Sequence, residues 1–304
     1  MADDLLPGLI VRAQSGFFEV ATPRGLITAE VRGRLKRAKR DSDLMALGDR
    51  VHLRPTDPGR GLIESIEPRV RVLSRRDPGS PREQVLIANP DQAVFILSAA
   101  EPAPLPRNRR LLDRMLVVEE RERLPAAVVV NKIDLTGRAA AAEPFLVYPE
   151  LGYPVLLASA KTGEGIEEVR DLLTGRISVL AGPSGVGKSS LLNALQPGLG
   201  LQTGAFSRST GKGTHTTVFP ALLPLDGGGY VADTPGLKAF QLWDIEPDEL
   251  DAYFRELAPL VAGCGFSDCT HLHEPGCAVR AAVADGRVSE SRYDSYKRMR
   301  RGEK

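Results

Sequence analysis

Short runs of apolar and β-branched residues, separated by Gly, Pro and Asp, fill the chain between residues 8 and 73. Runs of this length and composition are typical of short strands joined by turns. About five such strands in roughly 65 residues predict a small closed barrel, for which the OB type is one candidate. The clearest runs are at residues 17–21, 25–31, 50–53 and 61–66.

The pattern changes after residues 75–81, a segment of Arg, Pro and Gly that we interpret as a linker. Beyond it, continuous apolar runs alternate with helical periodicity, as at 93–97 and 111–122. Continuous apolar strands between helices predict a parallel sheet that is covered on both faces. Further strands are expected at 127–130, 155–158, 177–180, 222–225 and 230–232, the last two as a hairpin, and a further helix at 190–195.

The chain becomes helical again after residue 247 and ends in a basic helix. The fold class predicted from this pattern is α/β, with a parallel-sheet domain between a barrel and a small helical domain. We place the barrel at residues 1–75, the central domain at 76–243 and the helical domain at 244–304.

Composition and charge exclude several classes of protein. The formal net charge of +1 gives no overall attraction to nucleic acid, so only local basic patches can serve that purpose. No apolar run approaches the ~20 residues that a membrane span needs. The first residues, MADDLLPGLI, carry acids where a secretory signal carries Lys or Arg, and we therefore expect a cytoplasmic protein.

A phosphate-binding loop is the clearest motif. Residues 182–189 read GPSGVGKS, which fits G-x-x-x-x-G-K-[ST] between an expected strand and an expected helix. Backbone N–H groups of such a loop surround phosphate oxygens, the Lys reaches the β- and γ-phosphates, and the Ser binds Mg²⁺. The nucleotide-binding residues expected here are Ser184, Gly185, Val186, Gly187, Lys188, Ser189 and Ser190.

Two further loops point to guanine as the base. Asn131, Lys132 and Asp134 form N-K-x-D after an expected strand, and a carboxylate there can accept both N1–H and the 2-amino group of guanine. Adenine lacks that pair of donors and would leave the carboxylate unpaired. Ser159, Ala160 and Lys161 follow the next strand, where GTPases use the Ala N–H to contact guanine O6.

The sequence also predicts segments that respond to the γ-phosphate. Asp233 and Gly236 fit D-x-x-G, in which the Asp holds Mg²⁺ through water and the Gly N–H contacts the γ-phosphate. The polar stretch at 209–217 has no core-facing pattern and is expected to be a flexible loop. A Thr in it should complete the Mg²⁺ ligands, and the sequence leaves Thr216 and Thr217 as alternatives.

A histidine is the candidate for positioning the attacking water. Many GTPases place a Gln directly after D-x-x-G, but Leu237 occupies that position here and an apolar side chain cannot orient water. His215 lies in the expected flexible loop and could reach the γ-phosphate. The alternative is that His215 is an ordinary surface histidine and that a partner supplies the missing group.

Three cysteines near the end of the chain indicate a metal site. Cys264, Cys269 and Cys277 form an odd-numbered, closely spaced group, which argues against a disulfide framework. With one imidazole they form the ligand set of a closed structural zinc site. Spacing alone allows either His271 or His273 as the fourth ligand, and the alternative to a metal is three buried free thiols.

The guanine motifs at 131 and 159 precede the phosphate loop at 182, which reverses the usual order in GTPases. A circular permutation can preserve such a site, because the site is assembled from strand ends in space. This order, the barrel and the Cys/His group together closely resemble the ribosome small-subunit-dependent GTPase A family of bacteria. The matching strings include GLITAEVRGRLKR, ALGDRV, NPDQAVFILSA, NKIDL, SAKTGEGI, GPSGVGKSSLLNAL, GTHTT, VADTPGL and CGFSDCTHLHEPGCAV.

The resemblance covers essentially the whole chain. It implies an OB barrel, a circularly permuted P-loop GTPase domain and a zinc domain, with His271 as the zinc ligand and His215 as the catalytic histidine. It also implies a role in late maturation of the small ribosomal subunit, with GTP hydrolysis to GDP stimulated by that subunit. We expect a monomer that binds ribosomal RNA and no membrane.

Two basic runs, at 32–40 and 292–301, are candidates for RNA contact, and the alternative for the first is a solvated loop. Two other functions remain open from the residues alone. One is a GTPase that acts on another RNA or on a protein, and the other is an RNA-binding scaffold with a vestigial nucleotide site.

Overall fold

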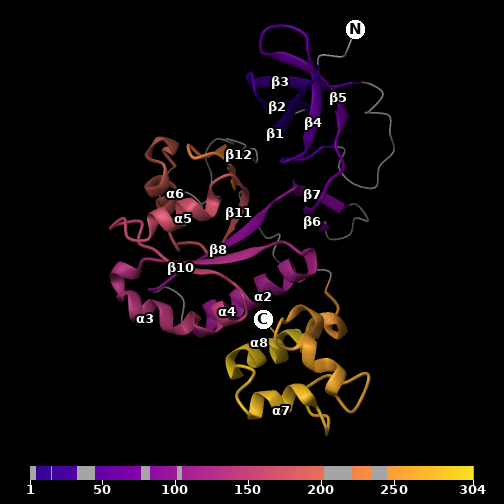
Figure 1. Cartoon of the computed structure of the whole chain (residues 1–304), viewed down its shortest axis with the longest axis vertical. Coiled ribbons are helices and arrows are strands. Elements are labelled where there is room, and N and C mark those ends of the chain that lie inside the picture. Colours follow the sequence, from indigo (N-terminus) through magenta and orange to yellow (C-terminus); the bar gives the residue numbers. More distant parts are fainter. Residues whose placement is uncertain are drawn as a thin grey trace, which may run out of the picture.

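The computed structural model describes residues 5–14, 16–32, 45–76, 83–100, 105–201, 221–233 and 245–303. Three parts follow one another along the long axis of the molecule (Figure 1). A small barrel lies at one end, an α/β domain in the middle and a helical region at the other end. Within the described residues, no helix is both long enough and apolar enough to span a bilayer.

The barrel contains five strands, as the alternating pattern predicts. They are β1 (Leu6–Gln14), β2 (Phe17–Thr22), β3 (Gly25–Val31), β4 (Arg50–Pro55) and β5 (Arg60–Ile66). The strands pair in the order β1-β2-β3-β5-β4, and β4 also pairs with β1, which closes the barrel. Alternate side chains such as Ile10, Val20 and Ile63 fill its interior and have no exposed surface.

A two-stranded hairpin follows the barrel, where the sequence suggested a linker. Strands β6 (Val72–Arg76) and β7 (Glu83–Ala88) pair in antiparallel fashion. The linker interpretation is therefore wrong for Arg75 and Arg76, which continue β6. The hairpin forms because Leu73 and Ile87, which are paired in register, both bury their side chains. The remaining linker residues, 77–81, lie outside the described residues.

The central sheet has the order β10-β9-β8-β11-β13-β12. Five strands are parallel, and β12 pairs with β13 in antiparallel fashion, as the predicted hairpin requires. Every residue of β8 and β11 is buried, which explains why their sequences are mostly apolar. The strands are β8 (Gln92–Ser98), β9 (Ala126–Asn131), β10 (Val155–Leu157), β11 (Ile177–Ala181), β12 (Ala221–Pro224) and β13 (Tyr230–Asp233).

Helices cover both faces of this sheet (Figure 1). One face packs against α2 (Leu105–Glu122) and the segment of α3 (Arg138–Ala142), η2 (Glu143–Phe145) and α4 (Val147–Glu150). The other face packs against α5 (Ile166–Leu173) and α6 (Lys188–Leu195). Helix α2 begins six residues before the expected 111 and includes Pro106 in its first turn, where the N–H that proline lacks would have no partner within the helix. Short η1 (Ile133–Leu135) and η3 (Pro197–Leu199) complete the domain.

The barrel and the central sheet are joined by backbone pairing. Strand β12 pairs with β1 in antiparallel fashion, with Arg12 opposite Ala221. Strand β12 directly follows residues 202–220, and its partner β13 directly precedes residues 234–244. These two segments contain the expected γ-phosphate contacts, so the barrel is joined to the hairpin that connects them.

The C-terminal region is helical and packs on α2. Its elements are η5 (Pro247–Tyr253), η6 (Ala258–Gly263), α7 (Ala278–Ala284) and α8 (Glu290–Arg300). Leu250, Phe254 and Tyr296 form a core that includes Val117 of α2. Arg292 of α8 is only 1% exposed and pairs with Asp113 of α2.

This packing limits how much of the basic run at 292–301 can serve as the RNA-contacting patch that the sequence suggested. Arg292 is inside the molecule, and other arginines of α8 pair with acids: Arg298 with Asp294 and Arg300 with Asp248. Because these acids offset the arginine charges, α8 presents less free positive charge than its sequence suggests.

Candidate nucleotide site and metal centre

The phosphate loop joins the end of β11 to the start of α6. Gly182 approaches β8 so closely that a Cβ atom there would lie 2.1 Å from the Ile96 carbonyl oxygen. The ammonium group of Lys188 lies inside the loop and donates to the carbonyl oxygens of Gly182 and Pro183, at 2.6 and 2.9 Å. Burial lowers the pKa of Lys188. The next residue, Ser189, is 5% exposed, so the start of the helix and the loop form one packed unit.

Asn131 connects the guanine motifs to the phosphate loop. Its side-chain amide donates to the Val186 carbonyl oxygen at 2.9 Å. Its side-chain oxygen accepts from the Ala160 backbone N–H at 3.1 Å. Gly187 leaves room for this contact, because a Cβ at that position would lie 2.6 Å from the Asn131 amide nitrogen. One buried side chain thus holds three loops together.

The other guanine-motif residues lie beside the phosphate loop. Lys132 has left-handed backbone geometry, with φ of 68°, and its ammonium group donates to the Gly185 carbonyl oxygen at 2.6 Å. The hydroxyl of the buried Ser159 donates to an Asp134 carboxylate oxygen at 2.6 Å. Asp134 and Lys161 are otherwise exposed, which leaves both accessible to a ligand.

The structure therefore brings together the loops that the sequence places far apart. The contacts of Asn131 and Lys132 put residues 131–134, 159–161 and 182–190 at the same carboxyl edge of the parallel sheet. Asp233 ends β13, the neighbour of β11, and so comes to this edge as well. His215, Thr216, Thr217 and Gly236 lie outside the described residues.

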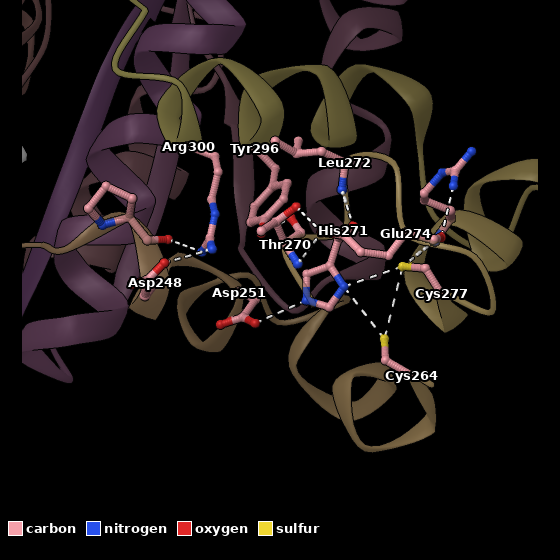
Figure 2. Close-up of polar contacts among 12 residues, drawn as sticks. Asp248, Asp251, Cys264, Thr270, His271, Leu272, Glu274, Cys277, Tyr296 and Arg300 are labelled. Carbon is pink, nitrogen blue, oxygen red and sulfur yellow. Dashed lines mark hydrogen bonds and ion pairs between the residues drawn. The ribbon is translucent and has the colours of Figure 1, made fainter. Parts of the chain in front are cut away.

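The Cys/His group forms a compact cluster in the C-terminal region, and Figure 2 shows three of its members, Cys264, His271 and Cys277. The sulfur and nitrogen atoms of Cys264, Cys269, His271 and Cys277 lie within 4.8 Å of one another. Nδ1 of His271 is 3.5 Å from the Cys264 sulfur and 3.4 Å from the Cys277 sulfur, and these two sulfurs are 4.0 Å apart. Burial is the main cause that raises the pKa of the Cys269 thiol to about 12.

These distances fit zinc. Zinc bonds of about 2.3 Å to sulfur and about 2.0 Å to nitrogen put tetrahedral sulfurs about 3.8 Å apart and sulfur about 3.5 Å from nitrogen. The observed separations agree with this geometry, and three of the four side chains are buried. The donors are the closed set of three sulfurs and one nitrogen that structural zinc sites use.

Two acidic residues support the cluster and were not anticipated from the sequence. Asp251 lies 3.0 Å from Nε2 of His271. Glu274 accepts from the backbone N–H groups of Thr270, Leu272 and His273 at 3.0–3.2 Å. Burial alone would raise the pKa of Glu274, but the hydrogen bond from Thr270 and those from backbone N–H groups outweigh it and lower the pKa. No spacing rule connects either acid to the cysteines, so only the fold identifies them.

The strand order, the phosphate loop and the attached N-K-x-D loop define a P-loop GTPase domain whose motifs are circularly permuted. Comparison with family models gives the same class. The RsgA GTPase model matches residues 66–243, and the RsgA N-terminal domain model matches residues 7–63.

Individual proteins are similar to this chain along nearly its whole length. The small ribosomal subunit biogenesis GTPase RsgA of Gemmatimonas aurantiaca is 46% identical over 297 residues, covering 96% of each chain. That of Moorella thermoacetica is 42% identical, covering 96% of this chain and 95% of its own. YjeQ from Thermotoga maritima superposes with a TM-score of 0.79 at 37% identity, covering 98% of both chains. YloQ, a circularly permuted GTPase, gives 0.74 at 31% identity, covering 98% of this chain and 94% of its own.

The chain therefore belongs to the RsgA GTPase family, and it is a GTP hydrolase.

Proposed function

We propose that this GTPase binds the small ribosomal subunit, acts in its late maturation and hydrolyses GTP to GDP with stimulation by the subunit. The main support for guanine-nucleotide binding is that Asn131 attaches the N-K-x-D loop to the phosphate loop. The ribosomal part of the proposal is supported by the relatives, which are small ribosomal subunit biogenesis GTPases and match this chain over nearly its full length.

Guanine selection is assigned to Asp134 and its neighbours. The Ser159 hydroxyl holds one carboxylate oxygen of Asp134, which fixes the orientation of the group before a base arrives. Asp134 then accepts N1–H and the 2-amino group of guanine, Lys132 lies along the base, and the Ala160 N–H contacts O6. Adenine would leave Asp134 without these two donors, which disfavours it.

The phosphate groups are assigned to the loop at 184–190. Lys188 exchanges its contacts with two loop carbonyls for contacts with the β- and γ-phosphates, and α6 directs its positive end at them. Hydroxyl and carboxylate oxygens are the ligands that suit Mg²⁺, and the residues that would hold it are Ser189 and either Thr216 or Thr217, with Asp233 through water. Mg²⁺ supplies positive charge to the phosphate oxygens when bound.

The attacking water is assigned to His215, because Leu237 occupies the position of the usual glutamine. An imidazole can accept a hydrogen bond from water and so orient its oxygen towards the γ-phosphate. Gly236 contacts the γ-phosphate through its N–H, so the segment around it responds to hydrolysis.

We assign each of the three domains a role in this function. Residues 1–75 form the RNA-binding barrel, 76–243 the permuted GTPase domain and 244–304 the domain stabilised by one structural Zn²⁺ on Cys264, Cys269, His271 and Cys277. The pairing of β12 with β1 gives the nucleotide state a route to the barrel, and so to binding and release of the subunit. We propose that the protein acts as a monomer on ribosomal RNA in the cytoplasm.

Two measurements test this proposal. GTP turnover is measured with and without purified small subunits, and we expect a large increase with them. Co-sedimentation with subunits is then compared with GDP and with a non-hydrolysable GTP analogue, at low and raised salt. We expect binding to depend on the nucleotide and to weaken with salt, because phosphate contacts do. Equal affinity in both nucleotide states contradicts the switch, and absence of subunit binding favours a different RNA or protein partner.

A further inference from the structure

His271 is held from two sides, one of which is outside the cysteine cluster (Figure 2). Its side chain is fully buried. Nδ1 faces the sulfurs of Cys264 and Cys277, whereas Nε2 lies 3.0 Å from a carboxylate oxygen of Asp251. Asp251 belongs to η5, which precedes all four cluster residues in the chain.

The two contacts together fix the chemical form of the ring. A carboxylate can only accept, so the ring must donate Nε2–H to Asp251. The neutral ring then has its lone pair on Nδ1, which is the nitrogen that faces the sulfurs. Carboxylates placed behind a metal-binding histidine select the tautomer, fix the ring and strengthen the nitrogen as a donor.

We infer that Asp251 is a positioning residue of the zinc site, acting through His271 without contacting the metal. The inference rests on the proposed zinc site and adds a residue that the ligand motif does not contain. The backbone of His271 has left-handed geometry, with φ of 61°, which costs a non-glycine residue energy, so surrounding contacts such as the one with Asp251 help to hold the residue in place.

Asp251 also connects the zinc site to the GTPase domain. Its neighbours in η5 and directly after it, Leu250 and Phe254, are buried in the core that includes Val117 of α2. At the start of η5, Arg300 donates to an Asp248 carboxylate oxygen at 2.7 Å. Zinc bound to His271 therefore stabilises, through Asp251, the first described element after residues 234–244.

Zinc affinity of the full-length protein tests the inference. Asp251→Ala and Asp251→Asn are compared with the natural chain by competition for zinc with a chromophoric chelator at fixed pH. We expect Asp251→Ala to lose about 10- to 100-fold in affinity, and Asp251→Asn, which keeps an acceptor oxygen without the charge, to lose less. Asp248→Asn is the matched control, because this exposed acid of the same helix contacts Arg300 and no cluster residue. Its affinity should stay within about twofold of the natural chain.

Two further readouts separate positioning from general damage. Cobalt(II) in place of zinc gives absorption bands that report ligand geometry, and we expect these bands to change in Asp251→Ala but not in Asp248→Asn. Zinc should slow amide hydrogen exchange in residues 247–254 of the natural chain, and this effect should diminish in Asp251→Ala.

The possible outcomes separate two claims, that the protein has a zinc site and that Asp251 positions His271 within it. A natural chain that binds no zinc overturns the zinc site itself. A natural chain that binds zinc, with both Asp251 variants equal to it in affinity and in cobalt spectrum, overturns the role of Asp251 alone.

Discussion

Replacing Arg292 with methionine removes the buried charge that joins the C-terminal region to α2. The Arg292 guanidinium donates to an Asp113 carboxylate oxygen at 2.6 Å and to a Glu256 carboxylate oxygen at 2.7 Å. All three side chains are nearly inaccessible to solvent, at 1%, 2% and 7% exposure. Desolvation by itself lowers the pKa of Arg292, but the two carboxylates outweigh it and raise the pKa, so the group stays charged.

The loss of stability arises because Asp113 and Glu256 stay buried when the Arg292 charge is removed. Removing one partner of a buried ion pair typically costs about 3–5 kcal/mol, because the other charge stays buried. Here the Tyr148 hydroxyl still donates to Asp113 at 2.7 Å, and the Ser295 hydroxyl also donates to it. Asp113 keeps these donors, whereas Glu256 loses both hydrogen bonds from Arg292. We therefore expect a destabilisation of about 3 kcal/mol or more, which corresponds to an increase of roughly 100-fold or more in the equilibrium constant for opening of α8.

Amide hydrogen exchange measures this opening region by region, which is appropriate because a chain of several domains has no single free energy of unfolding. In Arg292→Met, we expect faster exchange in α8 and η5 and unchanged exchange in the barrel strands. Arg298→Met is the control, because Arg298 is partly exposed on the same helix and its ion pairs should contribute less than about 1 kcal/mol. If both variants have the same effect on α8, Arg292 does not anchor this region.

Three other predictions concern the active site, the metal and pH. His215→Ala should lower subunit-stimulated GTP turnover and leave the GTP dissociation constant nearly unchanged, and loss of GTP binding would make His215 structural instead. Removing zinc with a chelator should increase hydrogen exchange in residues 264–277 while GTP binding persists, and unchanged exchange there would show that no metal supports the segment. Burial acts to raise the pKa of Asp294, but Arg298 and Arg110 outweigh it and lower the pKa. The stabilisation by Asp294 should therefore be present above about pH 4 and be lost as pH falls through the native pKa. Asp294→Asn should weaken the acid sensitivity of hydrogen exchange in α8, and an identical pH dependence would contradict this assignment.

Local sequence patterns predicted most of the elements because each pattern reflects the local environment of its strand. Alternation in the barrel strands corresponds to one buried and one exposed face, and the mostly apolar sequences of β8 and β11 correspond to burial on both faces. The phosphate loop was predictable because its chemistry needs a fixed set of residues in consecutive positions. The Cys/His spacing predicted the cluster of Cys264, Cys269, His271 and Cys277 for the same reason.

The features that the sequence did not reveal depend on contacts between distant residues. Arg292 lies in a basic run that is typical of surface helices, and its burial depends on Asp113, far away in the chain. Asp251 resembles any acid in a polar segment until the fold places it behind His271. The β6–β7 hairpin was missed because the Arg, Pro and Gly at 75–81 indicated a linker, whereas the buried pair of Leu73 and Ile87 determines the structure.

The central claim is that one guanine nucleotide contacts both the loop at 131–134 and the loop at 182–189. Hydrolysis of GTP and of xanthosine triphosphate by the natural chain and by Asp134→Asn, each with purified small subunits, tests it most directly. Xanthine carries an oxygen in place of the 2-amino group, so the amide of the variant can donate where the carboxylate accepted. The account predicts that Asp134→Asn prefers xanthosine triphosphate, with kcat/KM for GTP reduced by about 100-fold or more. A variant that keeps the natural preference for GTP would contradict it.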